Sequence, residues 1–158
     1  MMKLLLVLLL LGQADEEVLL DKGYELYSEE NYEEAITQYN LALILNDQNP
    51  ETYLLRGISW HAAAETKKAV DDLNKAIELQ PDYLEAYQQL GYILLVSQAP
   101  DRAIEAFDKA IELDPTNPEI YVNRGTAKCM NEDREGASAD WKMAKSLGVD
   151  YGEMMVCE

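Results

Sequence analysis

The sequence is poor in histidine and cysteine, on which many catalytic and metal sites depend. It contains one histidine, His61, and two cysteines, Cys129 and Cys157, in 158 residues. A His-dependent triad and a two-histidine metal site are therefore excluded within one chain. A glycine-rich phosphate loop, a nucleophile elbow and the acidic spacing of an EF-hand are also missing. We expect no catalytic, cofactor-binding or metal-binding residue, and hence no enzymatic activity.

Basic residues are scarce as well. Lys and Arg number 13 against 30 Asp and Glu, which gives a net charge of −17, and the bases are scattered along the chain. Nucleic-acid affinity rests on clustered Lys and Arg that displace phosphate counterions, so no nucleic-acid partner is expected. Adhesion to anionic lipid is disfavoured for the same reason. A basic partner fits this charge better.

One long apolar run stands near the N-terminus, where eight residues from Leu4 to Leu11 are unbroken by a polar side chain. Lys3 precedes the run, Gly12-Gln13-Ala14 follows it, and acidic residues 15–17 come next. This layout is typical of a secretory signal peptide cleaved after Ala14. We therefore predict that residues 1–14 are a signal peptide and that the protein is exported, to the periplasm or outside the cell.

A membrane anchor and a buried first helix are the alternatives for this run. Eight helical residues rise only about 12 Å, against a bilayer core of roughly 30 Å. A terminal helix on a small domain also needs a polar face, which the run lacks. We expect no stable membrane span after signal cleavage.

Export would place the two cysteines in an oxidising compartment. Cys129 falls inside a predicted helix and Cys157 is the penultimate residue. A bridge requires Cα atoms roughly 4.4–6.8 Å apart, a distance on which the sequence is silent. A disulfide and two free thiols both remain open, and we favour two free thiols.

Four columns of residues recur with a period of 34. Glycine occupies the first column, alanine the second and third, and a bulky side chain the fourth. The columns are Gly23, Gly57, Gly91 and Gly125; Ala35, Ala69, Ala103 and Ala137; Ala42, Ala76, Ala110 and Ala144; and Tyr39, Leu73, Phe107 and Trp141. Four columns in register over four copies identify an internal repeat.

The columns predict a pair of closely packed helices in each copy. Alanines seven residues apart share one face of the second helix and allow the first helix to approach closely. A glycine in the first helix costs about 1 kcal/mol of helix propensity, which only close packing would justify. We expect the bulky residue to fill the space beyond this contact. Proline is expected to open helices at residues 50, 100 and 118 and to follow the ends of helices at residues 81 and 115.

The repeat resembles the tetratricopeptide repeat (TPR), most clearly over residues 69–81 and 103–115. The resemblance implies an all-α fold, a right-handed superhelical solenoid of helix–turn–helix repeats. The copies span residues 16–49, 50–83, 84–117 and 118–151, and residues 152–158 form a short C-terminal cap or tail. Departures from the family pattern are Asp47 and Val149 in place of proline, and Lys22 and Arg56 in place of leucine.

In TPR proteins the first helices line a concave groove that accepts a peptide or a partner helix. Carried over by position, the resemblance implies four stripes, one of which is acidic throughout. The stripes are Glu17, Glu51, Glu85 and Glu119; Leu20, Leu54, Gln88 and Val122; Tyr24, Ile58, Tyr92 and Thr126; and Tyr27, His61, Leu95 and Cys129. From them we select eight residues, called the predicted groove residues: Leu20, Tyr24, Tyr27, Leu54, Ile58, His61, Tyr92 and Leu95. Some of these side chains could instead pack only against neighbouring helices.

The best-known TPR ligand is the acidic C-terminal tail of cytosolic chaperones, held by a clamp of Lys, Arg and Asn. The matching positions contain no Lys or Arg and include glutamates, so an acidic tail would be repelled. These positions are Leu20, Tyr24, Leu55, Glu85 and Gln89 in the first three copies, and Leu54, Ile58, Gln89, Glu119 and Asn123 in the last three. We expect no binding of chaperone tails.

The sequence thus predicts a non-enzymatic scaffold or adaptor of the cell envelope. It would bind a protein or peptide segment of apolar or basic character in the groove, in the manner of helix-in-groove recognition. A periplasmic holdase-type chaperone or assembly factor for exported proteins is the alternative.

Overall fold

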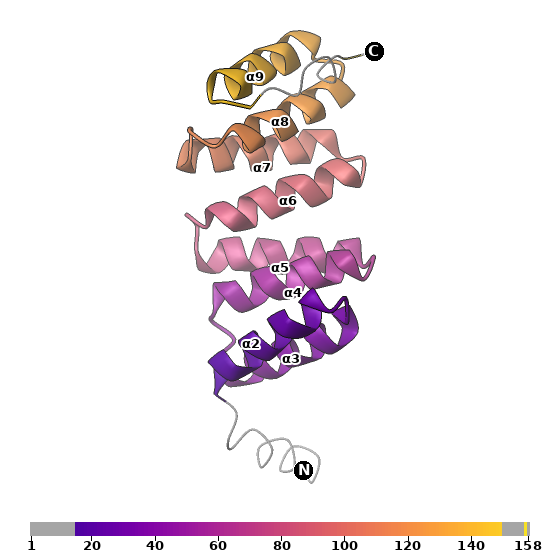
Figure 1. Ribbon diagram of the computed structural model, residues 1–158, viewed down its shortest axis with the longest axis vertical. Coiled ribbons are helices and arrows are strands. Elements are labelled where there is room, and N and C mark those ends of the chain that lie inside the picture. The colour runs from indigo at the N-terminus through magenta and orange to yellow at the C-terminus, as the bar shows by residue number, and fades with distance from the viewer. Residues whose placement is uncertain (1–14, 150–156, 158) are drawn as a thin grey trace. The chain divides into compact units, whose positions relative to one another are not determined.

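The computed structural model describes residues 15–149 and Cys157. The predicted signal peptide (1–14) and the predicted cap or tail (152–158), apart from Cys157, lie outside the described residues. The described part is all-helical and contains no strand. Its helices are α2 (Glu16–Ser28), α3 (Tyr32–Leu45), α4 (Pro50–Ala62), α5 (Thr66–Leu79), α6 (Leu84–Val96), α7 (Pro100–Leu113), α8 (Pro118–Met130) and α9 (Arg134–Ser146) (Figure 1).

The chain divides into two compact units, Met1–Asp72 and Leu73–Glu158, with the division inside α5. In the first unit α2 packs on α3 and α3 on α4; in the second α6 packs on α7, α7 on α8 and α8 on α9. No helix in the described part of the chain has the length and apolar character needed to cross a bilayer.

Helix starts follow the 34-residue period. The helices α2, α4, α6 and α8 begin at residues 16, 50, 84 and 118, where the predicted copies begin. Proline is the first residue of α4, α7 and α8, as predicted, because its fixed φ suits a first helical turn and its missing N–H would be unpaired there. The side chains of Asn49 and Asn117 cap α4 and α8 by accepting hydrogen bonds from the backbone N–H of Glu51 and Glu119, at 2.9 and 3.0 Å.

The glycine and alanine columns lie at the closest helix contacts. All eight column alanines are 0% exposed. A Cβ on Gly91 would come within 2.5 Å of the Phe107 ring, and one on Gly125 within 2.5 Å of the Trp141 indole. The rings of the bulky column therefore lie directly against the glycines. The expectation that they would fill space beyond the glycine contact was wrong: each ring occupies the volume that a glycine leaves empty.

Two arginines of the first helices tie neighbouring helices together. Arg56 on α4 donates to Asp72 on α5 through Nε and Nη2, both at 2.7 Å, and to Asn40 on α3 through Nη1 at 2.7 Å. Arg124 on α8 repeats the pattern: it donates to Asp140 on α9 at 2.9 and 2.6 Å and to Asp108 on α7 at 2.6 Å. Each arginine thus bonds the residues 16 positions before and after it.

Thr52 on α4 offers a test of the core. Its side chain is fully buried, and its hydroxyl Oγ1 has no hydrogen-bond partner among the described residues. A buried unpaired hydroxyl is unfavourable, and matching positions in other copies carry Val18, Ala86 and Ile120. We expect Thr52→Val to raise the free energy of unfolding by about 1 kcal/mol, measured by urea denaturation.

The matched control for this change is Thr126→Val, because the Thr126 side chain is exposed and its hydroxyl donates to the Val122 carbonyl at 2.9 Å. It should not stabilise the protein. A loss of stability in Thr52→Val would contradict the assignment of the Thr52 hydroxyl as unpaired.

Candidate functional site

The predicted groove residues lie on first helices that contact each other within a unit. In the first unit α2 contacts α4, and in the second α6 contacts α8. Six of the eight residues belong to the first pair: Leu20, Tyr24 and Tyr27 on α2, and Leu54, Ile58 and His61 on α4. Tyr92 and Leu95 lie on α6. Their role in binding stays a prediction.

These residues differ in how much surface they offer to a partner. Tyr24 and Tyr92 are 62% and 45% exposed, so each ring is available for contact. Leu54 and Leu95 are each 7% exposed and belong to the core of their units. For these two, packing against neighbouring helices accounts for the side chain.

The other four predicted groove residues are half-buried: Leu20, Tyr27, Ile58 and His61. The ring centroids of Tyr27 and Tyr32 lie 5.4 Å apart. Burial, and to a smaller extent Tyr32, raises the pKa of Tyr27, so its hydroxyl stays protonated at neutral pH. It therefore presents a neutral, hydrogen-bonding edge.

A cavity of about 410 Å³ lies at the contact of α6 and α8 in the second unit, and we call it the amide pocket. Its apolar lining comes from Phe107 and Ile120, which are both almost fully buried. Its remaining lining is polar or aromatic: Gln88, Gln89 and Tyr92 from α6, and Asn117, Glu119 and Asn123 from the start of α8. A size of this order suits a ligand side chain or a short backbone segment.

Three carboxamides of the amide pocket are free to bind a ligand. The side chains of Gln88, Gln89 and Asn123 are half-buried, and none of them makes a hydrogen bond or other polar contact with a described residue. Each carboxamide offers one acceptor oxygen and two N–H donors. Such groups match the alternating N–H and C=O groups of an extended peptide backbone.

The amide pocket is free of basic residues. Glu119 is its one carboxylate, and neither Lys nor Arg lines it. A carboxylate ligand would be repelled by Glu119, whereas a cation would be attracted. Sequence reasoning placed Gln88, Gln89 and Asn123 on the first helices but did not select them, because the selection followed apolar and aromatic stripes.

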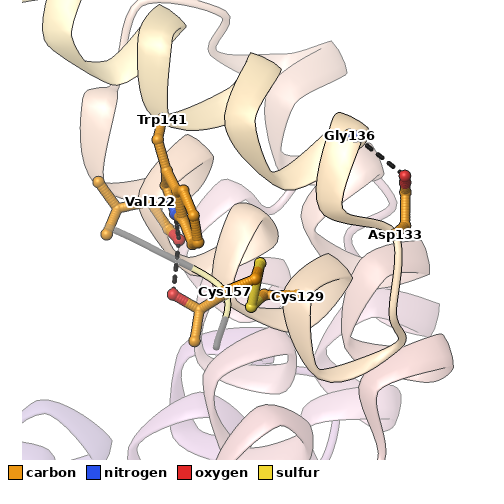
Figure 2. The surroundings of a disulfide bond; sticks show 7 residues. Val122, Cys129, Asp133, Gly136, Trp141 and Cys157 are labelled. Atoms are coloured by element: carbon orange, nitrogen blue, oxygen red, sulfur yellow. Dashed lines mark hydrogen bonds between the residues drawn. A yellow bond between two sulfur atoms is a disulfide. The ribbon is translucent and has the colours of Figure 1, made fainter. Parts of the chain in front are cut away.

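The two cysteines are joined by a disulfide, so the prediction of two free thiols was wrong. Cys129, near the end of α8, is bonded to Cys157, with the Cα atoms 5.6 Å apart (Figure 2). The bridge links residues 28 positions apart and fastens the C-terminus to α8. Cys129 belongs to the fourth stripe of first-helix positions, so the chain's own Cys157 covers that position in the last copy. Nearby, the Trp141 indole donates to the Val122 carbonyl at 3.3 Å.

Comparison with known proteins fits this geometry. The sequence profile described as TPR repeat matches residues 23–62 and 101–130. The chain carries tetratricopeptide repeats. A crystal structure of MamA protein is similar to this TPR chain, with 28% identity, a TM-score of 0.79, and coverage of 84% of this chain and 73% of that one. A thermophilic TPR protein of Thermus thermophilus is 21% identical, with a TM-score of 0.72 over 85% of this chain and 75% of that one.

A third TPR structure carries a ligand. The first TPR domain of Spaghetti (RPAP3), bound to the HSP90 peptide SRMEEVD, is 26% identical to this chain. It aligns with a TM-score of 0.65 over 78% of this chain and 91% of that one. No curated protein sequence matches this TPR chain. The structural comparisons establish the TPR fold and its use for protein–protein interaction.

Proposed function

We propose that this TPR protein is a non-enzymatic adaptor that binds a partner segment along its first helices, with the amide pocket as the centre of recognition. The observation that carries the proposal is the set of three carboxamides, Gln88, Gln89 and Asn123, which line a cavity and have no partner within the described chain. Carboxamides in this position pair with a peptide backbone, whose sequence they leave unspecified.

Specificity would come from the neighbouring side chains. Tyr92 is 45% exposed and offers a ring for apolar contact, and Glu119 offers a negative charge. Aromatic residues with a small surrounding set of polar groups dominate many protein interfaces. The proposed partner segment therefore carries an apolar side chain next to a Lys or Arg.

We also propose that the protein acts outside the cytoplasm, in the periplasm or as a secreted protein. The order of basic, apolar and small residues before Asp15 supports export. The Cys129–Cys157 disulfide supports it independently, because such bonds persist in oxidising compartments and are rare in the cytosol.

The test of binding uses selection from a random library of short peptides on the purified protein. We expect enriched peptides to combine an apolar residue with Lys or Arg, and acidic peptides to be depleted. Gln89→Ala with Asn123→Ala should weaken binding of an enriched peptide about tenfold, since each lost neutral hydrogen bond contributes roughly 0.7 kcal/mol. Fluorescence anisotropy with the labelled peptide measures this change.

Gln38→Ala is the matched control. Gln38 is a half-buried carboxamide on the second helix α3, where no binding is proposed, and its removal should leave affinity unchanged. Unchanged affinity in the pocket double variant, with normal helical circular dichroism, would move the binding site away from the amide pocket. Failure to enrich any peptide, together with suppressed aggregation of unrelated unfolded proteins, would favour a holdase-type chaperone instead.

A further inference from the structure

The arginine bridges of α4 and α8 have no counterpart on α6. The position 34 residues after Arg56 and 34 before Arg124 is Leu90, and the position matching Asp72 and Asp140 is Ala106. A leucine and an alanine cannot form the ion pair. In its place the second unit has a cavity of about 420 Å³, which we call the junction cavity.

The floor of the junction cavity is apolar. Leu90, Leu94 and Ala106 line it and are almost fully buried. Asn74 on α5 also lines it, at the position of Asn40, whose Oδ1 accepts a hydrogen bond from Arg56. No described residue bonds the Asn74 side chain. The cavity thus combines room for an apolar side chain with an unused hydrogen-bonding group.

The rim of the junction cavity carries two bases in a chain of net charge −17. Arg102 and Lys109 are seven residues apart on α7 and therefore lie on one side of that helix. Lys109 donates to Glu112 at 2.6 Å, and this hydrogen bond raises the pKa of Lys109. Arg102 makes no ion pair with any described residue, although Arg56 and Arg124 are both paired. Glu105 is the one carboxylate in the lining.

The junction cavity and the amide pocket lie on opposite sides of α6. Three residues of α6 line the amide pocket: Gln88, Gln89 and Tyr92. Three others line the junction cavity: Tyr87, Leu90 and Leu94. Because an α-helix turns once every 3.6 residues, these two sets point about half a turn apart. Occupation of one site leaves the other open.

We propose that the junction cavity is a second docking site, which takes a bulky apolar side chain from an acidic segment of a second partner protein. The apolar side chain enters over Leu90, Leu94 and Ala106, and carboxylates beside it pair with Arg102 and Lys109. This site is opposite in charge preference to the amide pocket, whose one ionised side chain at neutral pH is that of Glu119. The protein then bridges two partners, one basic and one acidic.

The test uses two synthetic peptides with blocked ends, one with a central Phe flanked by two Glu on each side, the other with Lys in place of Glu. Each is titrated into the ¹⁵N-labelled protein in about 0.15 M salt, where long-range repulsion by the acidic surface is screened. We expect the Glu peptide to shift the backbone amides of Leu90, Leu94 and Ala106, and the Lys peptide to leave them in place. Equal shifts with both peptides, or none with the Glu peptide, would overturn the proposal.

The chain supplies its own template for closing the junction cavity. Leu90→Arg with Ala106→Asp installs beside Asn74 the same trio that Asn40, Arg56 and Asp72 form. We expect this double variant to bind the Glu peptide about tenfold more weakly or not at all. Binding at wild-type strength by the folded double variant would overturn the proposal.

If the double variant does not fold, Arg102→Glu provides the test, since its exposed side chain has no structural contact to lose. It should weaken binding of the Glu peptide severalfold and allow the Lys peptide to bind; an unchanged preference would contradict the assigned rim. The Gln89→Ala and Asn123→Ala variant should bind the Glu peptide normally. This control separates failure of the junction site from failure of the amide pocket.

Discussion

Removal of the Cys129–Cys157 disulfide is expected to lower the free energy of unfolding of the unit Leu73–Glu158 by about 3.6 kcal/mol. The bond closes a loop of 28 residues that contains all of α9, and a loop of that length restricts the unfolded chain by this amount in the chain-entropy treatment. The variant to test is Cys129→Ser with Cys157→Ser. Because serine keeps the size of the side chain, packing around α8 changes little.

The measurement requires a signal from the last copy alone. In a Trp60→Phe background, Trp141 on α9 is the one remaining tryptophan, and its fluorescence in urea reports this region. The wild-type chain with reductant should unfold at the same urea concentration as the double serine variant, and reductant should not affect the variant. A difference below about 1 kcal/mol between oxidised and reduced protein would show that helix packing alone holds α9.

Asp140→Ala is expected to destabilise the protein by about 3 kcal/mol. The Asp140 side chain is almost fully buried and receives two hydrogen bonds from Arg124 and an ion pair from Lys128 at 2.9 Å. Those hydrogen bonds raise the pKa of Arg124, so the guanidinium keeps its charge when Asp140 is removed. Removal of one partner leaves a largely desolvated cation without its counter-charge, which costs several kcal/mol.

The cost should fall when the arginine is removed too. Arg124→Leu with Asp140→Ala reproduces the Leu90 and Ala106 arrangement that the chain itself uses one copy earlier, and we expect it to lie within about 1 kcal/mol of wild type. Urea denaturation of both variants gives the comparison. Glu25→Ala is the control, because its pair with Lys22 is exposed and should contribute less than about 0.5 kcal/mol. Equal losses in the single and double variants would mean that the pair itself stabilises the fold.

The repeat columns predicted the fold well because they follow from steric demands that act on single positions. A glycine or alanine is needed wherever two helix axes come closest, so Gly91 and Ala103 mark the contact in the sequence. Proline at the first helical position marks the helix starts in the same direct way. The partner of each glycine was less accessible to sequence reasoning, because the direction of the Phe107 ring depends on the distance between helices.

The site was harder to predict for two physical reasons. Selection by apolar stripes placed Leu54 and Leu95 in the groove, but an apolar side chain on an inner face gains as much from the core as from a ligand. It also passed over Gln89 and Asn123, since polar residues give no contrast in a hydrophobic pattern. The arginine bridges left a signal that recurs after 68 residues, as between Arg56 and Arg124, and a search at 34 residues does not detect it.

That doubled interval has a consequence for how the array can be shortened or lengthened. Deletion of residues 84–117 would join α5 directly to α8 and bring Asn74 to the position opposite Arg124, as Asn40 lies opposite Arg56. Each internal junction of the three-copy chain would then be ionic, and both cavities would disappear with α6. The third copy is therefore dispensable for a continuous array, and its departure from the ionic pattern is what gives this chain two sites instead of a uniform series of junctions.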